Sequence, residues 1–110
     1  MKIYLAIPYS QHEEESFDVA NRIAAQLMLS GHIVFSPISM NHCIAFENGL
    51  PKGWEFWEKF DKSFIEWCDC LMIVEMKTNG TLRIKQSVGV QDEIRLAYKL
   101  GKKIEFIKEN

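Results

Sequence analysis

The chain has 110 residues, which fits a single domain spanning residues 1–110 and able to bury roughly 65% of its unfolded surface. Hydrophobic residues make up 47% of the sequence, so the domain is expected to fold without disulfides or a structural metal. The net charge is −2 and the sequence has no basic run, which argues against a nucleic acid polymer or an anionic membrane as partner.

Cellular location is indicated by the first apolar run and by the cysteines. The run from Ile3 to Pro8 is too short for a signal peptide or a membrane span. The three cysteines, Cys43, Cys68 and Cys70, are an odd number, and we expect them to be reduced and mostly core-filling. We therefore expect a cytoplasmic protein. No pair of cysteines or histidines has zinc spacing, so no metal site is expected.

The first third of the chain alternates short apolar runs with an amphipathic stretch. Residues 2–8 form a run ended by proline, as in a strand covered on both faces. Residues 10–31 have apolar positions at helical spacing, with Ser10 and Glu13 at capping-box spacing and a glycine at the end. Residues 32–37 form a second short strand. A strand followed by a helix and another strand indicates a parallel pair.

The remaining elements continue the alternation. The sequence predicts an irregular stretch at 38–53, a helix at 54–68, a strand at 70–76, an exposed loop at 77–86 with a turn at Asn79 and Gly80, a helix at 87–101 and a strand at 103–107. Right-handed crossovers then give a three-layer, flavodoxin- or Rossmann-like α/β domain, with a short parallel sheet of order 2-1-3-4 and helices on both faces. Ligands of such sheets bind beyond the carboxyl ends of the strands, where the strand order reverses.

The last predicted helix begins with two adjacent carboxylates, and its periodicity predicts that they point in different directions. Val90, Ile94 and Ala97 lie on one narrow stripe, and Glu93 lies on its shoulder. Asp92 points nearly opposite, toward solvent. The alternative for Glu93 is a helix-start acid that is hydrogen-bonded to nearby amides.

Asp61 lies at the centre of the apolar stripe of the helix predicted at 54–68. An ionised and unpaired carboxylate at such a position costs several kcal/mol. Asp61 must therefore find partners, take up a proton or border a ligand cavity. The alternative to a functional role is a hydrogen bond to backbone or an ion pair with an inward arginine such as Arg22. Two inward carboxylates in different environments are what cleavage of a glycosidic bond requires.

Four segments resemble the nucleoside 2-deoxyribosyltransferase-like family, which includes 2′-deoxynucleoside 5′-monophosphate N-glycosidases. They are IYLAIPY, GHIVFSP, FDKSFIEWCDCLMIV and SVGVQDEIRLAYKLGKKI, and together they cover nearly the whole chain. The last two segments are the specific ones, because they hold an Asp eight residues before a second Asp and then Ser, Gly and Glu at a fixed spacing.

The resemblance implies roles for individual residues. Glu93 matches the family's nucleophile, which attacks the anomeric carbon, and Asp61 matches the aspartate that handles the proton of the base. Tyr4 matches the tyrosine that orients the glutamate. Asp69 matches an aspartate at the end of the middle helix, which we interpret as structural.

Two departures from the family pattern concern phosphate and the chain end. The monophosphate N-glycosidases carry an arginine after the first strand, but this chain has PYSQH there. Ser87 and the amides that begin the last helix could still hold an anion. The chain ends three residues after Ile107, which resembles the hydrolases more than the longer transferases.

The expected crevice is lined by loops that follow the strands. Our candidates for substrate binding are Tyr9, Ser10, Ser36, Pro37, His42, Trp57, Ser87 and Gly89. Tyr9 is the candidate for base stacking, whereas His42 either contacts a base or lies on an ordinary loop surface. The aromatic run Phe46, Trp54, Phe56, Trp57 and Phe60 belongs to the core, to a subunit interface or to a base-stacking wall.

The sequence thus predicts an enzyme that cleaves or transfers the N-glycosidic bond of a small-molecule nucleoside or nucleotide, without a cofactor. The nucleophile is Glu93, the proton donor is Asp61 and the orienting residue is Tyr4. The alternative is a non-catalytic nucleotide-binding protein, a sensor or a sequestering agent, that uses the same crevice. Because aromatic residues are abundant, we expect a homodimer or a higher homo-oligomer.

Overall fold

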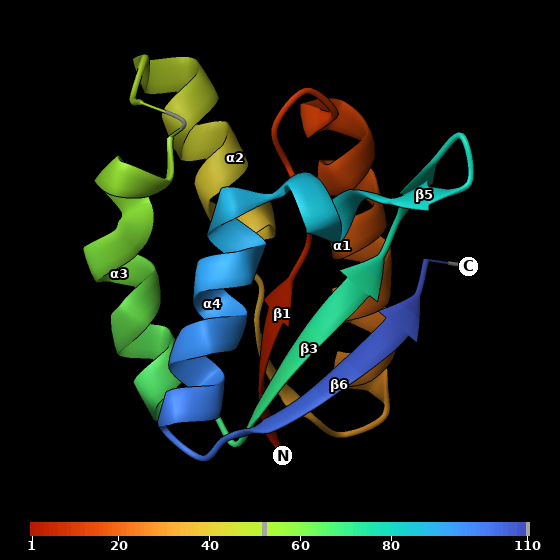
Figure 1. Ribbon diagram of the computed structural model, residues 1–110, viewed down its shortest axis with the longest axis vertical. Helices are drawn as coiled ribbons and strands as arrows, with labels where there is room; N and C mark the ends of the chain where they lie inside the picture. Colours follow the sequence, from red (N-terminus) through yellow and green to blue (C-terminus); the bar gives the residue numbers. More distant parts are fainter. Residues whose placement is uncertain (52, 110) are drawn as a thin grey trace.

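The computed structural model describes residues 1–51 and 53–109 and has three layers, with a parallel sheet between helices (Figure 1). The strands of this sheet are β1 (Lys2–Ala6), β2 (Ile33–Phe35), β3 (Cys70–Glu75) and β6 (Lys103–Lys108). They lie side by side in the order β2-β1-β3-β6. Because β6 is the fourth strand of the sheet along the chain, the predicted fold class and strand order are confirmed.

Alternation along β1 assigns its side chains to two separate cores. Ile3, Leu5 and Ile7 pack against helix α1 (Glu13–Leu29) on one face. Tyr4 and Ala6 point to the other face, which is covered by α3 (Trp54–Trp67) and α4 (Val88–Lys99). Figure 1 shows α1 behind β3 and β6, and the α3–α4 pair on the left, on the other side of β1. The carboxyl ends of β1 and β3 are adjacent, since Ala6 pairs with Ile73.

The start of α1 differs from the prediction. The helix begins at Glu13, not at Ser10, and no capping hydrogen bond joins the side chain of its N-cap residue to a described residue. The cause is a turn in which the amide of His12 donates to the carbonyl of Tyr9 at 3.1 Å. Gln11, inside this turn, has a φ of 70°. Ser10 therefore belongs to the turn, and the expected capping box does not form.

Helix α2 (Pro37–Asn48) replaces most of the irregular stretch that the sequence predicted at 38–53. Lys52, which belongs to that stretch, is outside the described residues. Three local features explain the helix. Ser36 is the N-cap, Pro37 takes the first helical position, and Gly49 ends the helix with a φ of 64°. The apolar residues of α2 form no clear stripe, so periodicity did not reveal the helix.

The loop after β3 is more ordered than predicted. The expected turn at Asn79 and Gly80 exists, with φ values of 52° and 80°. It joins two short antiparallel strands, β4 (Lys77–Thr78) and β5 (Thr81–Leu82), and a 3₁₀ helix, η1 (Arg83–Gln86), follows. At the end of η1, Ser87 caps α4 by accepting a hydrogen bond from the amide of Val90 at 3.2 Å.

The predicted chemistry of the cysteines holds in part. All three are free, and Cys68 and Cys70 are buried, whereas Cys43 is exposed on α2 and fills no core. Asp69 has the structural role predicted for it. Its carboxylate accepts a hydrogen bond from the amide of Lys2 at 2.9 Å, and its own amide donates to the carbonyl of Lys2 at 2.7 Å.

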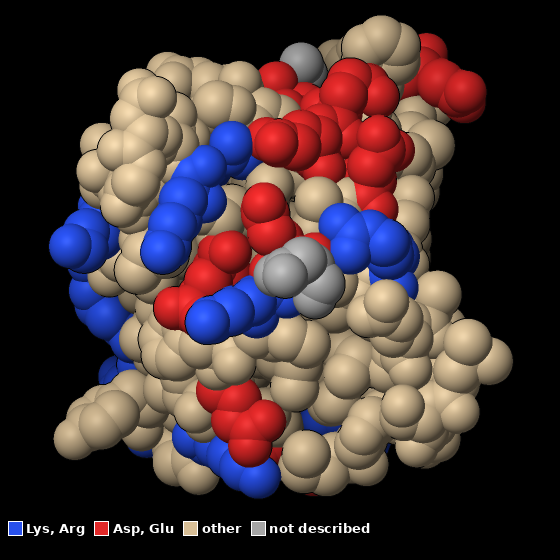
Figure 2. Space-filling view, turned by 90° about the vertical axis from the view of Figure 1, so that its right-hand side faces the viewer, with Lys and Arg blue, Asp and Glu red and all other residues tan. Residues whose placement is uncertain are grey.

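Surface charge is mixed on the face that carries the β4–β5 hairpin and the end of β6. Acidic side chains gather in the upper part of this face, and basic side chains lie beside them (Figure 2). Glu13, Glu14 and Glu15 form the acidic first turn of α1. Among the described residues, no helix combines the length and the apolar character needed to cross a lipid bilayer.

Candidate active site

A cavity of about 590 Å³ opens where β1 ends, at the point where the strand order reverses. The loop after β1, helix α2, the first half of α3, η1 and the start of α4 supply its walls. This is the position that the topology predicted for a ligand. The volume is in the range of small-molecule binding sites.

The two inward carboxylates both line this cavity. Asp61 and Glu93 are each 6% exposed, and they project from α3 and α4. Helical phase therefore predicted their direction correctly. Asp92, next to Glu93, points outward and forms an ion pair with Arg95, three residues further along α4.

Tyr4 connects the carboxyl pair. It is fully buried on β1, and its hydroxyl donates a hydrogen bond to Oε2 of Glu93. The same hydroxyl is near enough to Asp61 to lower the pKa of that carboxyl. Burial, followed by the charges of Glu93 and Asp61, raises the pKa of Tyr4 well above its usual value. Tyr4 therefore stays protonated and acts as a hydrogen-bond donor.

Both carboxyl groups hold protons more tightly than ordinary acids do. Burial raises the pKa of Asp61 to about 7, although the hydrogen bond from Tyr4 opposes it. Burial also raises the pKa of Glu93 to about 8, and the nearby charge of Asp61 adds to this effect. The pair therefore retains a proton near neutral pH.

The structural alternatives for the two acids are wrong. Arg22 does not face Asp61, because its Nη1 donates to the carbonyl of Glu109 at 2.7 Å. Among the described residues, Oδ1 of Asp61 has no hydrogen-bond partner. Glu93 is bound to the hydroxyl of Tyr4 and not to the amides at the start of its helix.

Helix α2 fixes Tyr9 at the wall of the cavity. The hydroxyl of Tyr9 lies 2.5 Å from Nδ1 of His42, and Nε2 of His42 lies 3.1 Å from Oε1 of Glu14. The ring of His42 stacks on Phe17 with ring centroids 4.4 Å apart. His42 is only 7% exposed, so its interpretation as loop surface is wrong. It lies in a helix that the sequence did not reveal.

Most of the predicted substrate-binding residues line the cavity, namely Tyr9, Ser10, Pro37, His42, Trp57, Ser87 and Gly89. Ser36 is the exception. It is buried as the N-cap of α2, and its hydroxyl is 2.7 Å from that of Ser39 instead of facing the cavity. Trp57 is turned so that Nε1 donates to the carbonyl of Pro51 at 2.8 Å.

Gly89 has a packing role that the sequence did not indicate. A Cβ atom at this position would lie 3.3 Å from Cε3 of Trp54. The absence of a side chain therefore lets the indole of Trp54 pack directly against the first turn of α4. Trp54 itself, which the sequence placed only in an aromatic run, is part of the cavity wall.

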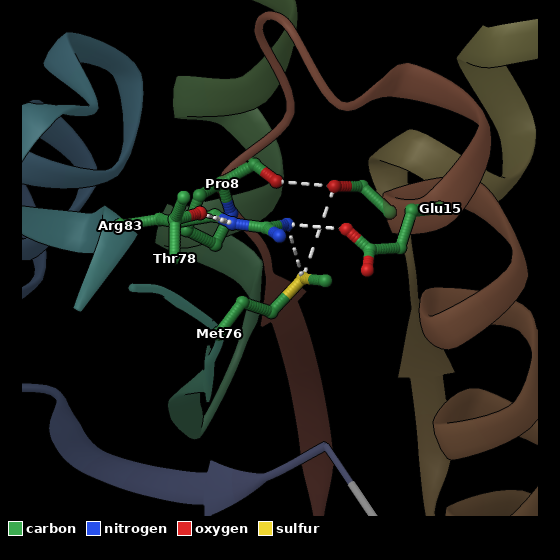
Figure 3. Close-up of polar contacts among 6 residues, drawn as sticks. Pro8, Glu15, Met76, Thr78 and Arg83 are labelled. Atoms are coloured by element: carbon green, nitrogen blue, oxygen red, sulfur yellow. Dashed lines mark hydrogen bonds and ion pairs between the residues drawn. The ribbon is translucent and has the colours of Figure 1, made fainter. Parts of the chain in front are cut away.

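Arg83 is a cavity residue that sequence reasoning missed (Figure 3). Its Nη1 lies 2.7 Å from Oε1 of Glu15, and its Nε donates to Oγ1 of Thr78 at 2.6 Å. The loop directly after β1 has no Lys or Arg, but η1 contributes Arg83 to the wall of the same cavity. Its position in the loop before Ser87 was the only available signal, and a loop position does not reveal which way a side chain points.

Family membership follows from comparison with known proteins. A family model described as a domain of unknown function, DUF1937, matches residues 1–109. The chain belongs to this family. Comparison with curated proteins gives no match for this DUF1937 chain.

Two solved structures resemble the DUF1937 domain. A 2-desoxiribosyltransferase from Leishmania mexicana is 17% identical with a TM-score of 0.66, over 97% of this chain and 63% of that protein. A 2-deoxyribosyltransferase from the psychrotolerant bacterium Bacillus psychrosaccharolyticus is 27% identical with a TM-score of 0.60, over 98% of this chain and 72% of that protein. The domain thus shares the fold of these proteins and spans less than two thirds of the Leishmania protein.

Proposed function

We propose that this DUF1937 domain cleaves or transfers the N-glycosidic bond of a nucleoside or nucleotide. The observation that carries the proposal is the triad of Tyr4, Asp61 and Glu93, in which one phenol hydroxyl lies between two buried carboxyl groups at the wall of one cavity. The likeness to two 2-deoxyribosyltransferases supports the same chemistry.

The proposed first step uses both carboxyl groups. The carboxylate of Glu93 attacks C1′ of the sugar and forms an ester, while the C1′–N bond breaks and its electron pair moves to the base. Asp61 gives its proton to the base, which then leaves as a neutral molecule. Tyr4 holds the attacking oxygen in place through its hydrogen bond.

The second step decides between hydrolysis and transfer. If water attacks C1′ of the ester, Asp61 takes up the proton of the water and free sugar is released. If a second base attacks C1′, its N–H proton passes to Asp61 and a new nucleoside forms. In both cases Glu93 leaves as a carboxylate, so the protein returns to its starting state without a cofactor.

The chemistry needs Glu93 ionised and Asp61 protonated. Burial raises the pKa of both carboxyl groups, so the free pair holds a proton near neutral pH. The proposed step needs this proton on Asp61. The hydrogen bond that Tyr4 donates to Glu93 favours this arrangement, because it stabilises the ionised form of Glu93.

The test is incubation of the purified protein with a panel of deoxynucleosides and their monophosphates, followed by chromatography for the free base. Release of base that Glu93→Gln abolishes is the expected result. A second free base, added to the same reaction, distinguishes the outcomes, because transfer produces a new nucleoside and hydrolysis does not.

A non-catalytic nucleotide-binding protein is the second candidate function. The raised pKa of Glu93 favours it, because a protonated carboxyl group is not a nucleophile. Binding of panel compounds without release of base from any of them would support this function and reject catalysis.

We also propose a homodimer that forms through α2. Phe46 on α2 is 68% exposed and Phe56 on α3 is 49% exposed, and both belong to the aromatic run noted in the sequence. Met40 and Ile44 add exposed apolar surface to α2. Light scattering at micromolar concentration is expected to show a dimer, and Phe46→Ser is expected to give a monomer. A monomeric wild-type protein would contradict the proposal.

A further inference from the structure

Three buried side-chain atoms of the described residues have no hydrogen-bond partner: Oδ1 of Asn41, Nε1 of Trp54 and Oδ1 of Asp61. All three residues line the same cavity. A buried polar atom without a partner costs about 1–3 kcal/mol, and native proteins contain few of them. Their concentration around one cavity indicates a ligand that supplies the missing partners.

Asn41 and Trp54 are separate from the catalytic triad in the fold. Asn41 lies on α2 and is 7% exposed, and Trp54 is the first residue of α3. The indole of Trp54 is held against Gly89, which fixes the direction of its N–H. An apolar residue at position 41 would cost nothing in hydrogen bonds within the fold, so a buried amide there serves something other than folding.

The surroundings of these two groups suit a flat heterocycle better than a sugar. The part of α2 that lines the cavity also contributes Ile38 and Ala45, and the rings of Tyr9 and Trp57 complete an apolar and aromatic wall. Such a wall packs well against a planar base. Sugar hydroxyls would leave their own polar groups unpaired against it.

We propose that Asn41 and Trp54 recognise the base, and that they select bases that carry an exocyclic amino group beside a ring nitrogen, as adenine and cytosine do. Oδ1 of Asn41 accepts a hydrogen bond from the amino group, and the Nε1–H of Trp54 donates to an acceptor on the ring. This inference rests on the proposed function only in assuming that a nucleoside occupies the cavity.

The discrimination follows from the partners that each base offers. In hypoxanthine and uracil an oxygen replaces the amino group, so Oδ1 of Asn41 would face a second acceptor. A site built around a hydrogen bond rejects ligands that lack the partner, because its own polar group stays unpaired. We expect the amino bases to bind at least about tenfold more tightly.

The experiment measures binding without turnover. Carbocyclic analogues, whose base does not leave because the ring oxygen is replaced by CH2, are compared in two pairs: deoxyadenosine with deoxyinosine, and deoxycytidine with deoxyuridine. Isothermal calorimetry on the full chain gives Kd for each compound. Within each pair the ligands differ at the amino or oxo position and in the proton on the adjacent ring nitrogen, so the ratio of Kd values reports the proposed contacts of Asn41 and Trp54 together.

Variants assign the preference to residues. Asn41→Leu is expected to lower the ratio within each pair several-fold, and Asn41→Asp keeps an acceptor and is expected to retain the preference. Trp54→Phe keeps an aromatic ring but removes the donor, so it is expected to weaken the amino member of each pair several-fold and the oxo member, whose ring nitrogen carries a proton, much less. Asn48→Leu is the matched control, because Asn48 lies on the same helix, is exposed and, among the described residues, bonds to the carbonyl of Ile44 alone. It is expected to change neither Kd.

Each outcome decides the inference. Equal affinities, or tighter binding of the oxo bases, would overturn it; the latter would mean that the amide of Asn41 presents Nδ2 to the ligand. Amino preference in binding with no base release from natural nucleosides would support this inference and reject the proposed catalysis. Base release without any preference would support the proposed catalysis and overturn this inference. A panel in which no compound binds would overturn both proposals.

Discussion

The two faces of the sheet bury side chains of the same strands but differ in polarity. On the α1 face, Ile3 and Leu5 of β1 meet Val19 and Ile23 of α1. The fully buried Ser16 on that side is satisfied, since its hydroxyl donates to the carbonyl of Pro8 at 2.5 Å. On the α3–α4 face, the same strand presents Tyr4, and the helices add Asp61 and Glu93.

This difference shows that one β-strand can contribute aliphatic side chains to a core on one face and a hydroxyl group to the candidate site on the other. Successive side chains point to opposite faces, so a two-residue period gives β1 an aliphatic side and a side that carries the hydroxyl of Tyr4. Both faces bury apolar surface, but the α3–α4 face also carries two acids whose ionised forms are disfavoured by burial. Mutations on the two faces should therefore have opposite effects.

The largest expected effect is on the α3–α4 face. Glu93→Gln keeps the size of the side chain but cannot form an ester, so base release should fall by at least about 10³-fold. The folded protein should be more stable at pH 8, because a buried acid is removed. Base release is followed by chromatography, and stability by urea unfolding.

Asp92→Asn is the control for Glu93→Gln. Asp92 points outward and pairs with Arg95, so its loss should change stability by only a few tenths of a kcal/mol and leave base release unchanged. A variant pair with the opposite behaviour would show that Asp92, and not Glu93, is the functional acid.

On the α1 face, Ile23→Ala should cost stability without changing chemistry. Ile23 is 1% exposed in the apolar core, and such a truncation costs about 2–4 kcal/mol through lost burial and a residual cavity. Base release per folded molecule should stay within twofold of the wild-type value. A large fall in this rate, measured where the variant is fully folded, would mean that the two faces are coupled.

The pH dependence of stability should reveal the buried acids. Folding raises the pKa of Asp61 from 3.8 to about 7 and that of Glu93 from 4.5 to about 8, so the folded state binds more protons than the unfolded state between these limits. Their stabilising contribution is complete below about pH 4 and is lost as the pH rises toward 8. With these pKa values the free energy of unfolding should fall by several kcal/mol, on the order of 6 kcal/mol, between pH 5 and pH 8.5.

Asp61→Asn sharpens this test. The variant lacks one of the two titrating acids, so its stability should fall less steeply with pH and should exceed that of the wild type at pH 8.5. Urea unfolding at several pH values gives both curves. Parallel curves for the two proteins would show that Asp61 has an ordinary pKa in the folded state.

The smallest expected effect comes from Gly89→Ala, which alters the wall of the cavity and leaves the acids in place. The new Cβ would approach Cε3 of Trp54 to 3.3 Å, so the indole must move by a few tenths of an ångström. Ligand affinity should weaken several-fold, while stability changes by less than about 1 kcal/mol. Calorimetry and the change in Trp fluorescence measure the two effects, and Gly53→Ala, where a Cβ would meet open space, is the control.

The sequence predicted those parts of the fold that repeat with a regular period. Apolar runs predicted the four strands of the sheet, and helical spacing predicted α1, α3 and α4. Helix α2 was missed because its apolar residues form no stripe, although Ser36, Pro37 and Gly49 mark its two ends. The start of α1 was misplaced because a turn took up Ser10.

The residues of the candidate site also divide into those that a local pattern indicates and those that only long-range contacts position. Helical phase alone indicated that Asp61 and Glu93 point inward, whereas the pairing of Glu93 with Tyr4 came from the family resemblance. Long-range contacts set the positions of Arg83 and His42, and no local pattern reports such contacts. The catalytic roles of these residues stay predictions.

The hydrogen bond between Tyr4 and Glu93 also constrains the order of folding. The two residues are 89 positions apart, and β1 pairs with β3 through Ile3 and Cys70. Closing such a long loop is slow compared with forming a helix. On the ribosome β1 is synthesised before α4, so the hydrogen bond from Tyr4 to Glu93 cannot form until α4 has been synthesised. The cluster of Tyr4, Asp61 and Glu93 can therefore assemble only after α4 has been translated.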